Sequence, residues 1–222
     1  DYLLNIISLE KLKDIINVSL VGKIDINGKF LSKNSSFEVN GKSNTLGGVL
    51  DFNSKNEKLN ATLKNIDIQE LSTMMNYPKF FDAKANLTFD YDSLLKKGNF
   101  NGNLLNGHFI ENSFTTLFNQ LSKEDLTKEV FETFDINSKI DDRILTSNLN
   151  MKSQNTQISI EDSILNLEKN LIDSKINAKI KDNSFAIALS GETLNPKISI
   201  DLKDLIKDKI IKQLEKKKNK IK

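Results

Sequence analysis

The side chains that carry out most enzymatic chemistry are scarce in this chain and do not form a recognisable site. His108 is the only histidine, and there is no cysteine. Protein metal sites need three or four ligands at suitable spacing, which a lone histidine does not provide. The lack of cysteine also excludes disulfides and thiolate nucleophiles within these 222 residues. We therefore expect no metal site and no bound cofactor.

Carboxylates are abundant, but they occur next to one another in the sequence. The clearest pairs are Asp141-Asp142, Glu124-Asp125 and Glu161-Asp162. A glycosidase-type pair needs two acids on separate elements that face one cleft, whereas adjacent acids in turns or on polar faces are typical of solvated charge. A glycine-rich phosphate loop, a nucleophile elbow and an HExxH motif are also missing. We expect no catalytic residues and a protein that is not an enzyme.

The basic residues argue against nucleic-acid binding. The chain has 32 basic and 30 acidic residues, and Arg143 is the only arginine. Proteins that read nucleic acids usually carry arginine for bidentate contacts and a basic stripe along one face. The densest basic run, 216–222, is typical of a solubilising helix end, and a surface for anionic lipid headgroups is the alternative. We expect no nucleic-acid partner.

The elements that would position any site are mostly strands. Apolar and polar residues alternate with period two, which is typical of a strand with one dry face. Such short, closely connected strands must be antiparallel to their neighbours, which predicts a meander of roughly ten to thirteen strands. The alternating segments are 18–26, 46–52, 59–63, 83–91, 134–140, 145–151, 158–167, 172–180, 185–189 and 198–200.

Turn-forming dipeptides separate several of these segments. Asn-Gly favours the positive-φ conformations of tight hairpins, and similar pairs favour turns more weakly. On this basis we predict turns at Asn27-Gly28, Asn40-Gly41, Lys97-Gly98, Asn106-Gly107, Asp141-Asp142 and Asp182-Asn183.

Four segments have a helical period instead. They are 8–16, 67–76, 112–131 and 201–218. Each places its apolar residues on one side, so we expect short amphipathic helices. The last would be capped by Asp201 and carries lysines at its C-terminal end, where they suit the helix dipole.

A sheet with one polar and one apolar face must cover the apolar face. It can close on itself as a barrel or sandwich, it can be covered by the helices, or it can stay open as a groove for an apolar ligand. We predict a mainly β fold, a long, curved, one-sided antiparallel sheet that forms a groove or half-open barrel. A single module over 1–222 is expected, with possible sub-repeats 1–107 and 108–222.

Several stretches resemble the AsmA family of bacterial envelope proteins. The most specific is 189–198, LSGETLNPKI, which is followed by an amphipathic segment and resembles a G-T-L-x-x-P ending with Glu192 inserted. Asp142-Arg143 departs from the family pattern, in which a glycine is expected in the turn. The other matching stretches are 63–71, 112–121, 141–145, 149–153 and 172–178.

The resemblance implies a location and a role. Members of the family are similar to TamB-like and bridge-like lipid transfer proteins, anchored in the inner membrane by an N-terminal helix with a β-groove in the periplasm. They are implicated in outer-membrane biogenesis and phospholipid movement. For this chain the resemblance implies an upstream anchor beyond these residues, phospholipid acyl chains and envelope proteins as partners, and no catalytic residues.

Two functional hypotheses follow. In the first, the apolar face lines a path for acyl chains, and a charge at Leu87 or Ile176 would block lipid binding in a folded protein. In the second, the face is a closed core, and the protein is a structural or protein-interaction scaffold in the periplasm. The residues that we predict to line the groove are Leu20, Ile24, Leu50, Leu87, Phe89, Ile136, Leu149, Ile176 and Ile187.

Overall fold

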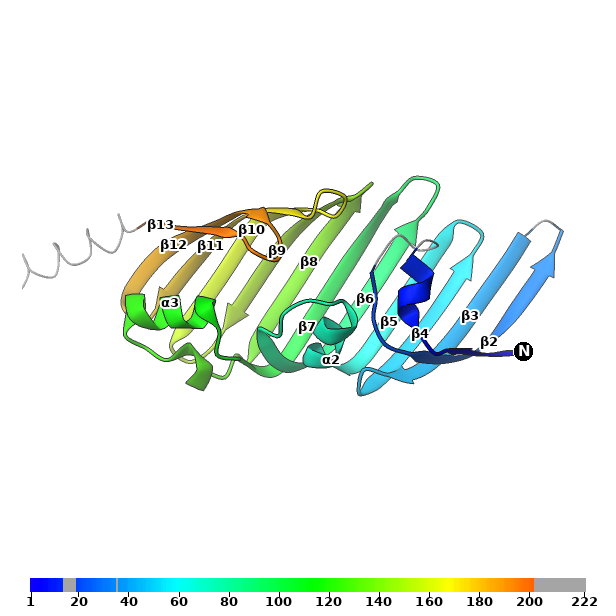
Figure 1. Ribbon diagram of the computed structural model, residues 1–222, viewed down its shortest axis with the longest axis horizontal. Helices are drawn as coiled ribbons and strands as arrows, with labels where there is room; N and C mark the ends of the chain where they lie inside the picture. Colours follow the sequence, from blue (N-terminus) through cyan, green and yellow to red (C-terminus); the bar gives the residue numbers. More distant parts are fainter. Residues whose placement is uncertain (14–18, 35, 202–222) are drawn as a thin grey trace, which may run out of the picture.

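A single antiparallel sheet dominates the computed structural model (Figure 1), which describes residues 1–13, 19–34 and 36–201. Its 13 strands follow one another in sequence order, and β1 and β13 form the two edges, so the sheet is not closed. The predicted mainly β fold with a long one-sided sheet is confirmed. The strands are β1 (Tyr2–Ile6), β2 (Ile24–Lys33), β3 (Ser36–Thr45), β4 (Gly48–Lys55), β5 (Lys58–Asp67), β6 (Phe81–Asp92), β7 (Lys97–Phe109), β8 (Thr133–Asp141), β9 (Ile144–Lys152), β10 (Thr156–Asn166), β11 (Leu171–Ile180), β12 (Asn183–Glu192) and β13 (Lys197–Asp201).

The helices are shorter than predicted. In place of one helix over 112–131 there are α3 (Ser113–Ser122) and the 3₁₀ turn η2 (Leu126–Lys128), because Lys123 adopts a left-handed conformation that ends α3. The other two described helical elements are η1 (Leu9–Leu12) and α2 (Ile68–Met74), within the predicted 8–16 and 67–76. The predicted helix over 201–218 lies outside the described residues, apart from Asp201, which ends β13.

Two predicted Asn-Gly turns are wrong, because both glycines lie inside strands. Gly28 in β2 pairs with Gly41 in β3. A Cβ on Gly28 would lie 1.9 Å from the backbone oxygen of Asn40 and 2.6 Å from the Tyr2 ring, and one on Gly41 would lie 2.6 Å from the Phe52 ring. These glycines are therefore small so that neighbouring aromatic rings can lie over them.

The same reason explains why β7 was not predicted. The pairs at 97–98 and 106–107 were interpreted as turns, yet they belong to a strand of 13 residues. A Cβ on Gly102 would meet Leu87 at 2.6 Å, and one on Gly107 would meet Phe81 at 2.1 Å. Large side chains of β6 thus lie over Gly102 and Gly107, whereas a Cβ on Gly98 would meet the backbone oxygen of Asp90 at 2.1 Å.

All the helical elements fall at one end of the sheet. In a meander, every second connection lies at the same end, and η1, α2 and α3 follow the odd-numbered strands β1, β5 and β7. We call this the helix end. The connections after even-numbered strands are short turns at the opposite end, along the upper edge of Figure 1, which we call the hairpin rim.

Bulges curve the sheet. The register shifts in β5 before Ile66, in β7 near Asn106 and in β10 near Asp162. Asn65, Asn106 and Asp162 have positive φ there, which asparagine and aspartate tolerate better than most residues. A bulge bends its strand and increases the local twist. The three bulges therefore help an open sheet to curve around its apolar face.

The hydrophobic core lies between the sheet and the helix end. Phe118 of α3 is fully buried and contacts Phe185 of β12, with ring centroids 5.1 Å apart. Phe131, after η2, contacts Phe81 and Phe109 at 6.0 and 5.4 Å. The connection between β7 and β8, which contains α3 and η2, therefore attaches to the sheet through aromatic contacts.

Replacing Phe118 by alanine is expected to lower the free energy of unfolding by about 3–5 kcal/mol, because it empties a fully buried aromatic site. Urea denaturation followed by circular dichroism measures the change. Leu105→Ala, at a half-exposed site on the polar face, is the control and should change it by less than about 0.5 kcal/mol. Equal effects of the two substitutions would contradict the location of the core.

Candidate functional site

The apolar face of the sheet is organised in rows that run across the strands. Residues paired in register on neighbouring strands share a face, so a row can be followed from strand to strand. The central row runs without interruption from β3 to β13. It consists of Ser43, Leu50, Leu63, Leu87, Gly102, Ile136, Leu149, Ile160, Ile176, Ile187 and Ile200.

A second row lies on the helix side of the central row and is largely buried. All its side chains except that of Phe134 are buried beneath the helical elements and their connections. We call this the helix-side row. It consists of Ile66, Ala85, Leu104, Phe134, Met151, Ile158, Ala178 and Phe185.

Two further rows lie between the central row and the hairpin rim, and together we call them the open half. None of their apolar side chains is buried. The first consists of Tyr2, Gly28, Gly41, Phe52, Ala61, Phe89, Phe100, Ser138, Ser147 and Ser163. The second consists of Phe30, Val39, Ser54, Leu59, Tyr91, Gly98, Ile140, Leu145, Leu165, Ile172 and Gly191.

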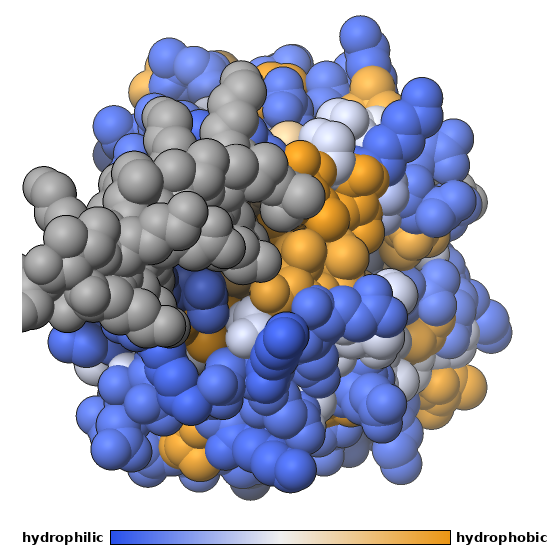
Figure 2. Space-filling view, turned by 90° about the vertical axis from the view of Figure 1, so that its left-hand side faces the viewer, coloured by the Kyte–Doolittle hydropathy of each residue, from blue (hydrophilic) through white to orange (hydrophobic). Residues whose placement is uncertain are grey.

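The contrast between the rows defines the candidate site. The same face of the same strands is dry at the helix end and partly exposed toward the hairpin rim. Viewed from the end at which β13 lies, hydrophobic residues gather in the middle of the molecule and hydrophilic ones surround them (Figure 2). The open half is therefore the part of the apolar face that the helical elements leave partly exposed.

The open half changes in character along the sheet. Between β4 and β7 it is aromatic, and Phe89 and Tyr91 stack with ring centroids 6.1 Å apart. Between β8 and β10 its first row turns to serine, and the hydroxyls of Ser138 and Ser147 lie 2.7 Å apart. This hydrogen bond lets two polar groups lie between apolar rows without leaving either hydroxyl unpaired.

Most of the predicted lining residues share one row. Leu50, Leu87, Ile136, Leu149, Ile176 and Ile187 all belong to the central row. Phe89 lies in the open half. Ile24 pairs with Ile6 at the start of β2, and Leu20 precedes β2 and is not part of the sheet, so the predicted strand 18–26 begins too early.

Three of these residues belong to the core. Leu87, Ile176 and Ile187 are 4%, 4% and 0% exposed. A charge at any of them would enter an apolar interior, which proteins tolerate poorly. Substitution at these positions therefore tests folding, and binding has to be tested in the open half.

The sequence interpretation missed other residues of the open half as site residues. Phe100 is the clearest, because it lies in β7, which was not predicted as a strand. Tyr91 and Leu145 belong to predicted strands, yet nothing in the sequence shows which end of a strand the helices cover. The alternation along each strand predicts which residues lie on the apolar face. It does not predict which row of that face a residue belongs to.

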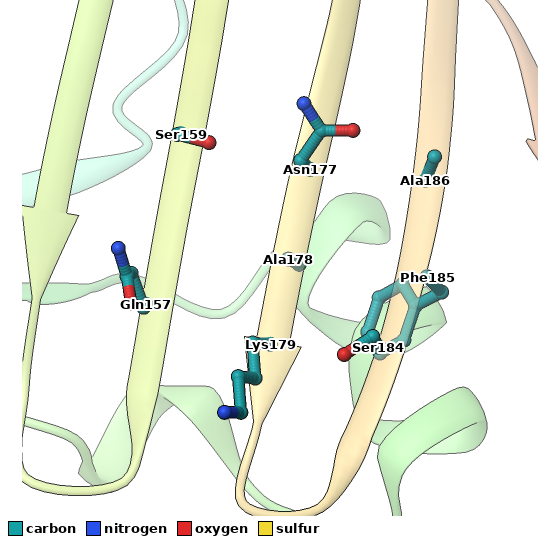
Figure 3. Close-up of a pocket in the computed structure, with 8 residues that line it drawn as sticks. All are labelled: Gln157, Ser159, Asn177, Ala178, Lys179, Ser184, Phe185 and Ala186. Atoms are coloured by element: carbon teal, nitrogen blue, oxygen red, sulfur yellow. The ribbon is translucent and has the colours of Figure 1, made fainter. Parts of the chain in front are cut away.

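The opposite face of the sheet is polar. A depression of about 210 Å³ on it is lined by residues of β10, β11 and β12, among them Gln157, Asn177 and Lys179 (Figure 3). Another is lined by Asn86, Asn101 and other polar side chains of β6 to β9. These depressions contain amides and hydroxyls without a cluster of titratable groups, and we assign them no chemistry.

The residues first considered for chemistry have structural partners. His108 lies within β7 on the polar face, not in a turn, with its Nε2 3.8 Å from Asp82. Asp141 and Asp142 pair with Lys97 and Lys96 at 3.3 and 3.4 Å. Within the described ranges, no group of three or more histidine, cysteine or acidic residues could hold a metal ion.

The other two acidic pairs also have roles in the fold. Glu124 pairs with Lys181 at 2.7 Å, which ties the connection after α3 to the turn between β11 and β12. A hydrogen bond from the Thr127 side chain is the main cause that lowers the pKa of Asp125 below its usual range. Asp162 forms the bulge of β10, and its N–H donates to Asn148.

Asp67 holds the helix that covers β5 and β6. Its carboxylate accepts hydrogen bonds from the N–H groups of Gln69 and Glu70, at 2.9 and 3.2 Å, and pairs with Lys84 at 3.4 Å. Desolvation raises the pKa of Asp67, but these donors together lower it by more, so the pKa lies below its usual range. The ionised form therefore stabilises α2.

Comparison with protein-family models, with curated proteins and with solved structures found no match. Within the residues that the structure describes, no helix is both long and apolar enough to cross a membrane. The function has to be argued from the open half itself.

Asp67 caps the start of α2 by accepting the N–H groups of Gln69 and Glu70, and an Asp67→Asn variant tests this role through its pH dependence. A lowered folded pKa means that the stabilisation is fully present above the unfolded value of about 3.9 and is lost as pH falls through the folded value. The difference in unfolding free energy between wild type and Asp67→Asn should therefore be steady above about pH 5 and shrink below about pH 4. Urea titrations across this range measure it, and a difference independent of pH would contradict the role of the carboxylate.

The open half also predicts dye binding by the native protein. An apolar fluorophore such as 1-anilinonaphthalene-8-sulfonate should bind and brighten while the protein still unfolds cooperatively. Phe89→Asp should weaken this binding, since it places a charge among partly exposed aromatic rings. Leu105→Asp, on the polar face, should leave it unchanged. Fluorescence that appears only during unfolding would show that the face is closed.

Proposed function

We propose that this protein is a non-catalytic module that holds phospholipid acyl chains along the open half of its apolar face. The observation that carries the proposal is the pair of partly exposed rows that cross the strands from β1 to β12. Folded monomers rarely leave large contiguous apolar patches in water, and such patches usually mark binding sites. The proposal includes the role implied by the AsmA resemblance, namely phospholipid transport or outer-membrane biogenesis.

The physical mechanism is passive. Hydrocarbon gains about 0.8 kcal/mol for each methylene removed from water, and it gains this wherever it lies along the rows. Neighbouring strands are about 4.8 Å apart, so an acyl chain that lies across them contacts several strands at once. It can move from one set of strands to the next without losing all its contacts. Headgroups would stay beyond the hairpin rim, in water.

The composition of the open half suits such a ligand. Aromatic rings of Phe52, Phe89 and Phe100 offer flat apolar contacts on neighbouring strands. Ile140, Leu145 and Leu165 continue the apolar surface toward the C-terminal strands. Their contacts are non-directional, so the site would select for hydrocarbon and not for a particular headgroup.

The envelope location is part of the same proposal. A periplasmic module anchored in the inner membrane would meet phospholipids at a membrane surface and would need to shield their acyl chains from water. A scaffold role for the same fold would need the apolar face to be closed. The helical elements bury the helix-side row and part of the central row but leave the open half partly exposed, which favours the lipid-binding function.

Native mass spectrometry tests the proposal after purification from bacterial cells. We expect phospholipid adducts at a defined ratio on the wild-type protein. Leu145→Asp, in the open half, should reduce lipid uptake at least about tenfold, because it removes a leucine contact and adds a charge. Leu105→Asp is the matched control, since it makes the same change at a half-exposed leucine on the polar face.

Circular dichroism and urea titration of both variants establish that each is folded. A wild-type protein that carries no phospholipid and takes up none when it is added would refute the proposal. Equal lipid uptake by Leu145→Asp and Leu105→Asp would refute the assignment of the open half.

A further inference from the structure

We propose that the hairpin rim is a docking surface for an anionic phospholipid bilayer. This inference concerns a surface outside the open half, and it goes beyond the holding of acyl chains. The rim is formed by the turns between β2 and β3, β4 and β5, β6 and β7, β8 and β9, β10 and β11, and β12 and β13.

The rim is a continuous structure and not a set of independent loops. Backbone hydrogen bonds connect each turn to the next, as from the N–H of Asp142 to Lys96 O at 2.7 Å and from that of Leu167 to Arg143 O at 2.9 Å. Ion pairs add to this, including Arg143 with Glu168 at 3.3 Å. The remaining backbone links are Asn56 to Phe37, Ser93 to Glu57 and Thr193 to Asn170.

Leucines project from this rim into water. Leu94 and Leu95, in the turn between β6 and β7, are 77% and 63% exposed, and Leu194, in the turn between β12 and β13, is 64% exposed. Leu167 and Leu171, which flank the turn between β10 and β11, are also exposed. Large apolar side chains at several tips of one edge form a pattern that a single exposed leucine would not.

The turns hold these leucines outward by specific hydrogen bonds. The Asp92 carboxylate accepts the N–H groups of Leu94 and Leu95 at 3.1 and 2.9 Å. Asn166 does the same for Glu168 and Lys169, at 3.1 and 2.8 Å. At both tips, backbone N–H groups are therefore hydrogen-bonded to a local side chain, and the leucine side chains can enter the acyl region of a bilayer.

Lysines beside the exposed apolar residues favour an anionic bilayer as the partner, although Glu57 and Glu192 also lie at the rim. Lys33, Lys169 and Lys197 lie at turns with exposed apolar residues, and within the described part of the chain they form no ion pair. Lysine beside leucine suits a membrane interface, where the ammonium group meets anionic headgroups while the leucine enters the acyl region.

The longest described connection at the opposite end, 110–132, has the reverse character. The connection 110–132 carries five acidic residues and two lysines, so an anionic surface would repel it. The orientation with the hairpin rim toward the membrane therefore agrees with the charges at both ends. In this orientation the open half lies next to the bilayer, while the helix end points away from it.

Co-sedimentation with vesicles of phosphatidylglycerol and phosphatidylethanolamine tests the inference. Wild-type protein should bind these vesicles, more weakly at high salt, because the lysine contribution is screened. The double variant Leu94→Asp, Leu95→Asp should lose at least about tenfold in partition coefficient, since each leucine contributes when it enters hydrocarbon. Leu105→Asp should bind like the wild type.

A second measurement separates this inference from the proposed function. Uptake of a dispersed short-chain phospholipid should be the same in the double variant as in the wild type, because the open half is unchanged. Wild-type protein that takes up dispersed lipid but does not bind vesicles would overturn the docking surface alone. Vesicle binding that is equal in wild type and double variant would also overturn it, whereas rim-dependent vesicle binding without uptake of dispersed lipid would support it and refute the proposed function.

Discussion

The need to cover one apolar face governs this structure, and the meander topology restricts how that need can be met. Strands that pair only with their sequence neighbours place every second connection at the same end. The described helical elements follow odd-numbered strands, whereas the connections after even-numbered strands are short turns. The described helical elements therefore cover the apolar face from one end only. It buries the helix-side row and leaves the apolar side chains of the open half in partial contact with water.

The other features of the molecule fit this arrangement. Bulges at Asn65, Asn106 and Asp162 curve the sheet around its apolar face, which shields the open half without closing it. Glycines such as Gly102 leave room for the large side chains of neighbouring strands. The short turns of the hairpin rim are held by local hydrogen bonds, so their exposed leucines and lysines are a property of the fold. An apolar surface and a membrane-compatible edge thus lie side by side.

Alternation in the sequence was enough to predict the antiparallel sheet and to select the apolar face, as the shared row of Leu50, Ile136 and Leu149 shows. It was not enough to predict β7, because Asn-Gly pairs there follow from close packing against Phe81 and Leu87 and not from turns. Nor could it separate the fully buried Ile187 from the partly exposed Leu145. That difference depends on register, on the bulges that shift it and on where the helices lie, and these are long-range properties.

If the proposed function is right, acyl chains lie on the open half. A phospholipid with a photoactivatable diazirine near the end of its acyl chain tests this most directly, with crosslinked residues identified by peptide mass spectrometry. We expect crosslinks at residues such as Phe89, Tyr91 and Leu145, and none on the polar face around Asn177. Crosslinks confined to the polar face, or spread equally over both faces, would contradict the proposal.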